Sequence, residues 1–295
     1  MITADFLAWF TSEEPGTVWA DVVSVGFDSS IWALPGFDLK WGYGFRIGAG
    51  YDLPYDGWDT NLYWTWFRTD GKHTIPPQPL TLLTAEFFAA FLNGDIPQSM
   101  VGKWALLLDM FDWELGRSYC VSENLSLRPF VGLKGGWINQ SIHVLYNNLI
   151  ISSVLTDNFG KEHLKNNFWG IGPLGGVNTK WTLRHFDCHL IDLFGDFSIA
   201  TLWGRWHCTD VYKNTLSKTY KIIMPNQSLG GLMFRGFVGI GWDVDVNGGR
   251  SHFAAKLGYE MQLWVNQLRL PTFQLQRLHN DLTLQGVTFN CRVDF

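Results

Sequence analysis

The chain has 295 residues, a formal charge of −5 and only 17% charged residues, below the ~25% that is usual in soluble domains. The acidic balance argues against a nucleic-acid partner, which would call for a basic face. The 16 Trp suit a membrane interface, but no apolar run reaches the ~18 residues of a helical span, so a membrane would have to be crossed by strands.

The first half of the chain predicts strands that are separated by turns and long excursions. Residues 2–10 form the first strand, and 11–37 form a long loop with local β structure around 18–27. Residues 39–53 alternate apolar side chains with glycine and charge, which is the pattern of a two-faced strand. After a turn at 54–57, residues 58–68 return as the next strand.

In the long connection at 69–97, the apolar residues follow a different spacing from that of the strands. Leu80, Leu83, Phe87 and Phe91 fit a helical spacing, so we expect a helix within this loop. Further alternating segments follow at 101–114, 127–139, 168–180 and 191–203, with polar loops at 141–165 and 205–228. Pro173 is awkward inside a strand because proline cannot donate to the ladder.

The C-terminal segments alternate most clearly. In 253–265 the odd positions are apolar, whereas the even positions include Lys256, Glu260 and Gln262. Segments 232–246 and 287–295 repeat the pattern, and the residues at 247–250 have the turn chemistry of a hairpin.

The connections alternate strictly in length. Short ones follow Leu53, Glu114, Lys180 and Val246, and long ones follow Phe10, Arg68, Asn139, Trp203 and Val265. We therefore predict an all-β, single-domain protein over 1–295: a transmembrane antiparallel up-and-down β-barrel of about 10 strands (10–12, or more if loop segments pair). Short turns and both termini should lie on the periplasmic side, and the long loops outside. The helix should cover the mouth, with insertion into the lumen as the alternative.

Several motifs resemble one family. Residues 45–52 (FRIGAGYD), 63–67 (YWTWF), 168–173 (FWGIGP), 178–181 (NTKW) and the ending at 282–295 are similar to the Legionella major outer membrane protein family, which includes the MOMP-like porins of environmental chlamydiae. The resemblance implies a porin-type barrel in the bacterial outer membrane, abundant at the cell surface. It transfers no pore-lining position.

Charged side chains cannot face lipid cheaply, so those at mid-strand positions should point inward. We predict that the pore is lined by Arg46, Lys134, Arg235, Lys256, Glu260 and Arg292. Their mixed signs predict passive, weakly selective diffusion of small polar solutes or ions. Inward glycines such as Gly42 and Gly48 leave room for a narrow pore, although small barrels are often filled by their own side chains.

Two other functions stay open. A surface adhesin or structural outer-membrane protein with a plugged lumen would use the long loops to bind a host-surface ligand. An outer-membrane protease would need Asp70, His73, His207 and Asp210 to converge at the mouth, a weak spacing signal. We expect a non-enzymatic protein without cofactor or metal, with the lipid bilayer and lipopolysaccharide as surroundings. A homo-oligomer stays open.

The chain ends and cysteines give two further expectations. Residues 1–5 lack the basic region and apolar core of a secretory signal, which indicates a mature chain. Cys120, Cys188 and Cys291 should lie near the periplasmic rim, where inter-subunit disulfides are one hypothesis and small apolar filler is the other. With Cys208, they show no metal-ligand spacing.

Overall fold

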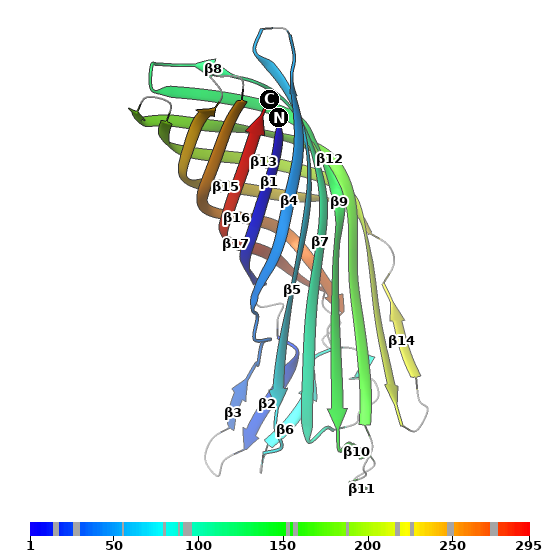
Figure 1. The fold of residues 1–295 in the computed structure, drawn as a ribbon. Coiled ribbons are helices and arrows are strands. Elements are labelled where there is room, and N and C mark those ends of the chain that lie inside the picture. The colour runs from blue at the N-terminus through cyan, green and yellow to red at the C-terminus, as the bar shows by residue number, and fades with distance from the viewer. Residues whose placement is uncertain are drawn as a thin grey trace.

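Ten long strands close into a barrel in this computed structural model (Figure 1). The structure describes every residue except 14–17, 26–29, 55, 79–80, 88, 91–95, 152–153, 156–158, 187–188, 216–218, 225–226, 247–250 and 272–276. The barrel strands are β1 (Ile2–Ser12), β4 (Trp41–Asp52), β5 (Trp58–Ile75), β7 (Ser99–Arg117), β9 (Leu125–Asn147), β12 (Phe159–Phe186), β13 (His189–Asn214), β15 (Gln227–Val246), β16 (Ser251–Pro271) and β17 (Arg277–Asp294).

Every barrel strand pairs antiparallel with two others. The order β12-β13-β15-β16-β17-β1-β4-β5-β7-β9 closes because β9 also pairs with β12 and β1 joins β17 to β4. Closure lets backbone groups be paired inside the sheet, as hydrocarbon demands. The predicted barrel and its ten strands are confirmed. Among the described residues, no helix is long and apolar enough to span a bilayer.

Short additional strands lie at the two ends of the barrel. At the end that holds both termini, β8 (Tyr119–Cys120) pairs with β9. At the other end, β2 (Ala20–Val25) pairs with β3 (Ser30–Ala33) and β6 (Thr81–Ala85), β10 (Ile150–Ile151) pairs with β11 (Val154–Leu155), and β14 (Thr219–Ile223) pairs with β13. The strand ends that short connections join (52 and 58, 117 and 125, 186 and 189, 246 and 251) gather at the terminal end, which is the periplasmic side in barrels of this type.

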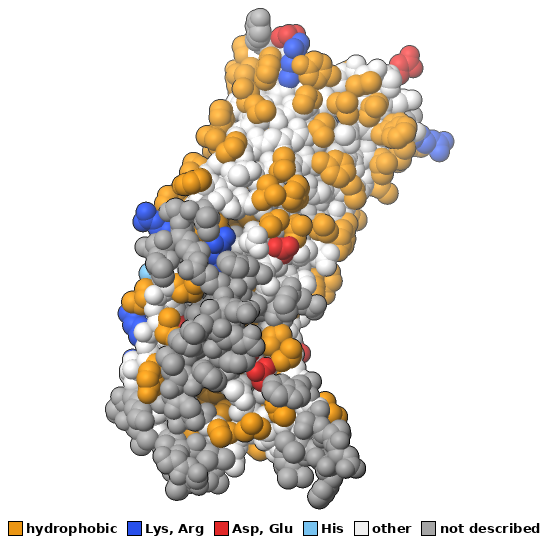
Figure 2. Space-filling model, turned by 180° about the vertical axis from the view of Figure 1, so that it is seen from behind, with side chains coloured by type: hydrophobic (Ala, Val, Ile, Leu, Met, Phe, Trp, Pro, Cys, Tyr) orange, Lys and Arg blue, Asp and Glu red, His pale blue; other side chains and the backbone are white. Residues whose placement is uncertain are grey.

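The outer face is apolar, as the alternation predicts. Tyr259 and Met261 are 49% and 46% exposed, while Glu260 between them is 0% exposed. In Figure 2, hydrophobic side chains gather on the surface of the terminal half of the barrel. Oily side chains therefore face the lipid, and ionised ones share the interior.

A row of tryptophans marks the outer edge of this apolar band. Trp66 on β5, Trp137 on β9 and Trp169 on β12 lie in one register row, with Asp109 of β7 between the first two. We call Trp66, Trp137 and Trp169 the tryptophan row. Tryptophan favours the headgroup depth of a bilayer, and the next outward residues beyond the row on β5, β9 and β12 are polar: Arg68, Asn139 and Asn167. Strands of up to 28 residues thus continue well past the ~9–11 that a crossing needs.

The long excursions contain more strand than the sequence predicted. Most of the expected loops at 141–165 and 205–228 prolong the hairpins of β9–β12 and β13–β15. The helix predicted over 80–91 is wrong at 81–85. These residues form β6, which pairs with the free edge of β2. A helical turn remains at Ala89–Ala90, and Phe91 lies outside the described residues.

Pro173 lies in mid-strand opposite Leu133 of β9. On its other side, β12 pairs with β13 at Ile171 and again at Leu174, but not at Gly172 and Pro173. The ladder is therefore interrupted where proline lacks a donor. Among the cysteines, Cys120 is exposed in β8, Cys291 is half-buried, Cys208 is buried, and Cys188 lies outside the described residues.

The apolar band gives a first prediction. Ile199 is 46% exposed on the outer face of β13 inside the band, while Thr209 faces outward on the same strand beyond it. We expect Ile199→Lys to reduce the free energy of unfolding by roughly 2–4 kcal/mol, because the ammonium group would meet hydrocarbon. Thr209→Lys should cost well under half of that. Reversible unfolding from liposomes in guanidinium measures both, and equal costs would contradict the assigned band.

Candidate functional site: a charged chamber in the barrel

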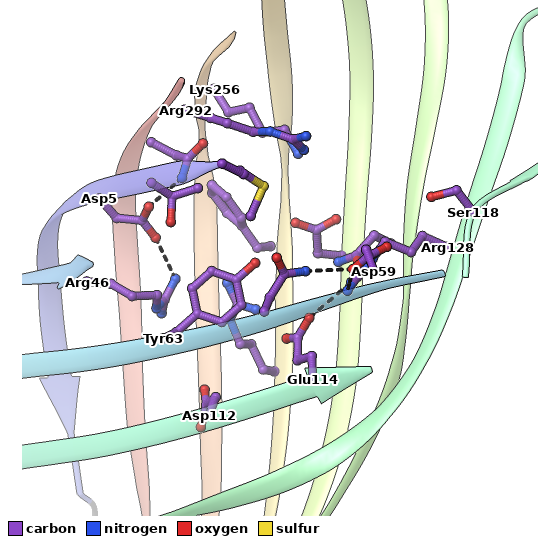
Figure 3. A pocket seen from close by; sticks show the side chains of 18 of the residues that line it. Asp5, Arg46, Asp59, Tyr63, Asp112, Glu114, Ser118, Arg128, Lys256 and Arg292 are labelled. Atoms are coloured by element: carbon purple, nitrogen blue, oxygen red, sulfur yellow. Dashed lines mark hydrogen bonds and ion pairs between the residues drawn. The ribbon is translucent and has the colours of Figure 1, made fainter. Parts of the chain in front are cut away.

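A polar chamber of about 220 Å³ lies inside the terminal half of the barrel (Figure 3). Its side-chain cations and carboxylates nearly balance. The carboxylates are Asp5, Asp52, Asp59, Asp112, Glu114 and Asp196, and the cations are Arg46, Arg128, Arg235, Lys256 and Arg292. A chamber with both signs can hold hydrated ions without strong preference for either.

Glu260 is the centre of the first ion network. Its carboxylate accepts hydrogen bonds from Arg46 Nη2 at 2.8 Å and Arg235 Nε at 2.7 Å. Arg46 also contacts Asp5 at 2.8 Å. The register explains this meeting, because Arg46 lies directly opposite Asp5, and Arg235 lies opposite Gln262, two residues along the strand from Glu260 and on the same face. A fully buried carboxylate with two guanidinium partners avoids the cost of an unpaired buried charge.

Arg128 of β9 organises a second network across three strands. Its guanidinium group contacts Asp59 of β5, Glu114 of β7 at 3.0 Å and the amide oxygen of Asn178 on β12 at 2.7 Å. Figure 3 shows Asp59 and Glu114 turned toward it. These bonds tie one wall of the chamber together.

Further cross-strand ion pairs lie nearby. Lys134 Nζ is 2.7 Å from Asp112, which is its register partner on β7, and the same ammonium group lies 5.8 Å from the ring of Trp264. Lys180 pairs with Asp243 and, at 3.2 Å, with Asp192. Each of these side chains comes from an inward position of its strand.

The structure brings the six residues chosen from the sequence to one region of the interior. Arg46, Arg235, Lys256 and Arg292 line the chamber. Lys256 lies 4.9 Å from the ring of Phe194, and Arg292 contacts Asp294 at 2.9 Å. Glu260 and Lys134 lie buried behind this lining, at 0% and 3% exposure. Their role in a pore stays a prediction.

Sequence reasoning missed four of the six carboxylates that line the chamber. Asp5, Asp59, Asp112 and Glu114 all line it. The sequence places Asp112 and Glu114 at even-numbered positions of β7, like Trp104 and Met110, so all four lie on the same face of the strand. Those apolar residues point inward and are buried, so an oily side chain did not mark the lipid face on this strand.

The loop half of the barrel is filled by apolar side chains. Trp9, Phe67, Trp104, Phe168 and Trp264 are at most 1% exposed there, and they belong to one continuous buried cluster. The cluster includes Leu83, Phe87, Ala89 and Ala90 from the 81–90 segment. This segment enters the barrel, which corrects the expectation that it would only cover the mouth.

The inward glycines do not leave free space. A Cβ at Gly42 would lie 2.5 Å from the ring of Phe67, and one at Gly48 would lie 2.4 Å from the ring of Tyr63. These glycines instead provide the room that large inward side chains of the next strand occupy. The expectation that they widen a pore is therefore wrong.

Two buried carboxylates hold the inserted segment. The backbone amide of Ala89 donates to Asp210 and that of Ala90 donates to Glu162, both at 2.8 Å. The hydroxyl of Tyr146 also donates to Glu162. Both acids lie beyond the tryptophan row, on the outer extensions of β12 and β13. Burial raises the pKa of Asp210 to about 6 and the pKa of Glu162 well above its ordinary value.

The four residues that a protease would need do not converge. Asp70 and His207 are exposed on the outer face of their strands, while Asp210 is buried inside with Ala89. His73 contacts Asp38 at 3.1 Å. No water-activating pair forms from these side chains.

Comparison with known proteins places the chain in a family. The sequence matches the family described as "Legionella pneumophila major outer membrane protein precursor" over residues 2–295. The chain belongs to this family. It is thus an outer-membrane β-barrel protein, as its apolar band and closed sheet independently indicate. No curated protein matches the chain at a significant level.

Solved structures give weak alignments. A Pseudomonas aeruginosa FadL homologue aligns over 99% of this chain and 88% of its own, at 9% identity and a TM-score of 0.24. The P. putida toluene transporter TodX aligns over the same shares, at 9% identity and a TM-score of 0.23. OmpT of Vibrio cholerae aligns over 97% and 98%, at 6% identity and a TM-score of 0.14. Such low TM-scores carry no argument about this chain.

The Glu260 network gives a second prediction. Glu260→Gln leaves Arg46 and Arg235 without their shared counter-charge, so we expect the free energy of unfolding to fall by roughly 3–5 kcal/mol. Asp56→Asn is the matched control, because it breaks the exposed pair with Arg117 and should cost about 0–1 kcal/mol. Denaturant unfolding measures both variants. Equal losses would show that the buried network does not stabilise the barrel.

The carboxylates at Ala89 and Ala90 give a third prediction. Their raised pKa values mean that the inserted state binds more protons than a released, hydrated state, so insertion is favoured at acidic pH and weakens as pH rises through about 6. Hydrogen exchange at the amides of Ala89 and Ala90, corrected for intrinsic rates, should show less protection at pH 8 than at pH 5. Asp210→Asn should flatten this dependence, and equal protection at both pH values in the unaltered protein would refute it.

Proposed function

We propose that the barrel is a porin that lets small polar solutes or ions diffuse passively across the outer membrane. The observation that carries the proposal is the charged chamber, with its near-balance of carboxylates and cations. A barrel that served only as a membrane anchor would have no need of so many buried charges, since each must be paired or hydrated. The proposal makes the protein a passive channel rather than an enzyme.

Passage through the loop half requires the inserted segment to move. The apolar cluster that includes Phe87 and Ala89 occupies the lumen between the chamber and the outside. The described arrangement is therefore a closed state in this proposal, and the Asp210 and Glu162 contacts hold it closed.

Conductance across a planar bilayer tests the proposal. We expect discrete openings, and we expect Lys256→Glu combined with Arg292→Glu to shift the reversal potential toward cations, by a factor of about two to ten in permeability ratio. Lys72→Glu, on the outer face of β5, is the control and should leave selectivity unchanged. Glu260 is a poor reporter of selectivity because it is buried behind two arginines.

A plugged structural or adhesive surface protein is the second candidate. The close packing of Trp9, Phe67 and Trp264 inside the barrel favours it. Folded protein that never conducts, at pH 5 or pH 8 and over a wide voltage range, would replace the porin proposal with this one.

A further inference from the structure

Beyond the tryptophan row, the outer surface of the barrel becomes basic over β7, β12 and β13. Exposed cations alternate with buried positions on these three strands. They are Lys103, Lys161, Lys165, Arg205 and Lys213. The same stretches, 99–107, 139–147, 159–167 and 205–213, contain only two acids, and both Glu162 and Asp210 are buried inside. In a chain with a net charge of −5, the outer face of these four stretches thus carries cations and no acid.

The register places like charges against each other on this surface. Lys161 lies directly opposite Lys213, and Lys72 lies opposite Lys103. Like charges at directly opposed positions destabilise a sheet. An external anion that binds between them would offset the repulsion.

Two stacked histidines continue the row from Lys103. His143 and His163 are register partners with ring centroids 3.8 Å apart. Burial, followed by the nearby His143 and Lys165, lowers the pKa of His163 to about 4. At neutral pH His163 is therefore uncharged, and the positive charge of the surface comes from lysine and arginine.

A hollow of about 220 Å³ lies where this basic surface meets the apolar band. Its walls form two register rows across β9, β12 and β13. The first row is Trp137, Trp169 and Arg205, and the second is Asn139, Asn167 and His207. The two indoles, 49% exposed each, can cover the apolar part of a ligand, and the guanidinium group suits a phosphate.

We propose that this hollow and the cations beyond it bind the phosphorylated headgroup of lipopolysaccharide in the outer leaflet. The hollow is continuous with the lipid-facing band, so its ligand must lie at the membrane surface. From Arg205 to Lys213 the cations spread over eight residues, or roughly 26 Å along the strand. A glycerophospholipid carries its phosphate at a single depth, whereas a phosphorylated glycolipid presents anions at several depths.

Each part of the hollow has a partner in such a ligand. Arg205 binds a phosphate of the lipid anchor, Asn139 and Asn167 offer amide groups to sugar hydroxyls, and the indoles contact acyl chains. Lys165 lies four residues beyond Trp169, within reach of a phosphate further out along the sugar chain. This assignment is independent of whether the lumen conducts.

The test compares two double variants with equal charge change. Arg205→Gln with Lys165→Gln removes two cations from the surface, and Arg117→Gln with Arg184→Gln removes two from the short-turn end. Refolded barrels in neutral detergent are titrated with purified lipopolysaccharide, and binding is measured by native mass spectrometry. We expect the first pair to weaken binding about tenfold or more and the second to change it less than about twofold.

Ligand variants separate the sources of phosphate. Enzymatically dephosphorylated lipopolysaccharide should bind the unaltered barrel as weakly as intact lipopolysaccharide binds the first double variant, which keeps the proposal testable if that variant does not fold. Equal binding of intact and dephosphorylated lipid would overturn the proposal. So would displacement by phosphatidylglycerol or inorganic phosphate at equal phosphate concentration, because either would indicate a general anion surface.

Discussion

The pairing of backbone amides and carbonyls inside a closed sheet is the constraint on which this structure depends. In hydrocarbon an unpaired peptide group has no water to bind, so an open sheet edge is not tolerated. The pairing of β1 with β17 and of β9 with β12 removes both edges. It also fixes every register, and the register then decides which side chains meet inside and outside.

The closed register turns isolated charges into networks. Arg46 meets Asp5 because the two are cross-strand partners, and it reaches Glu260 over the two intervening strands β1 and β17, 214 residues away in the chain. Paired in this way, charges can be kept at the depth of the membrane without facing lipid. The same register places Lys161 against Lys213 on the outside, beyond the apolar band, where two like charges face each other.

The interior is divided along the barrel axis. The terminal half holds the charged chamber, and the loop half holds a packed apolar cluster with the segment around Ala89. The two carboxylates that bind this segment lie among apolar neighbours, so their protonation and the position of the segment are coupled. A porin function and a closed resting arrangement are compatible through this coupling.

The sequence by itself determined the all-β barrel, its ten strands, the side of the termini and the lipid-facing residues of the C-terminal strands, because a period of two over ten or more residues permits only one pleated orientation. It also identified Arg46, Arg235, Lys256 and Arg292 as inward groups. Only the tertiary structure decided that Trp104 and Met110 point inward, that Phe67 fills the space beside Gly42, and that Ala89 enters the lumen. Alternation shows that a strand has two faces. Where the interior is also apolar, the sequence pattern of an inward face is the same as that of a lipid-facing one, and only the closed register distinguishes the two.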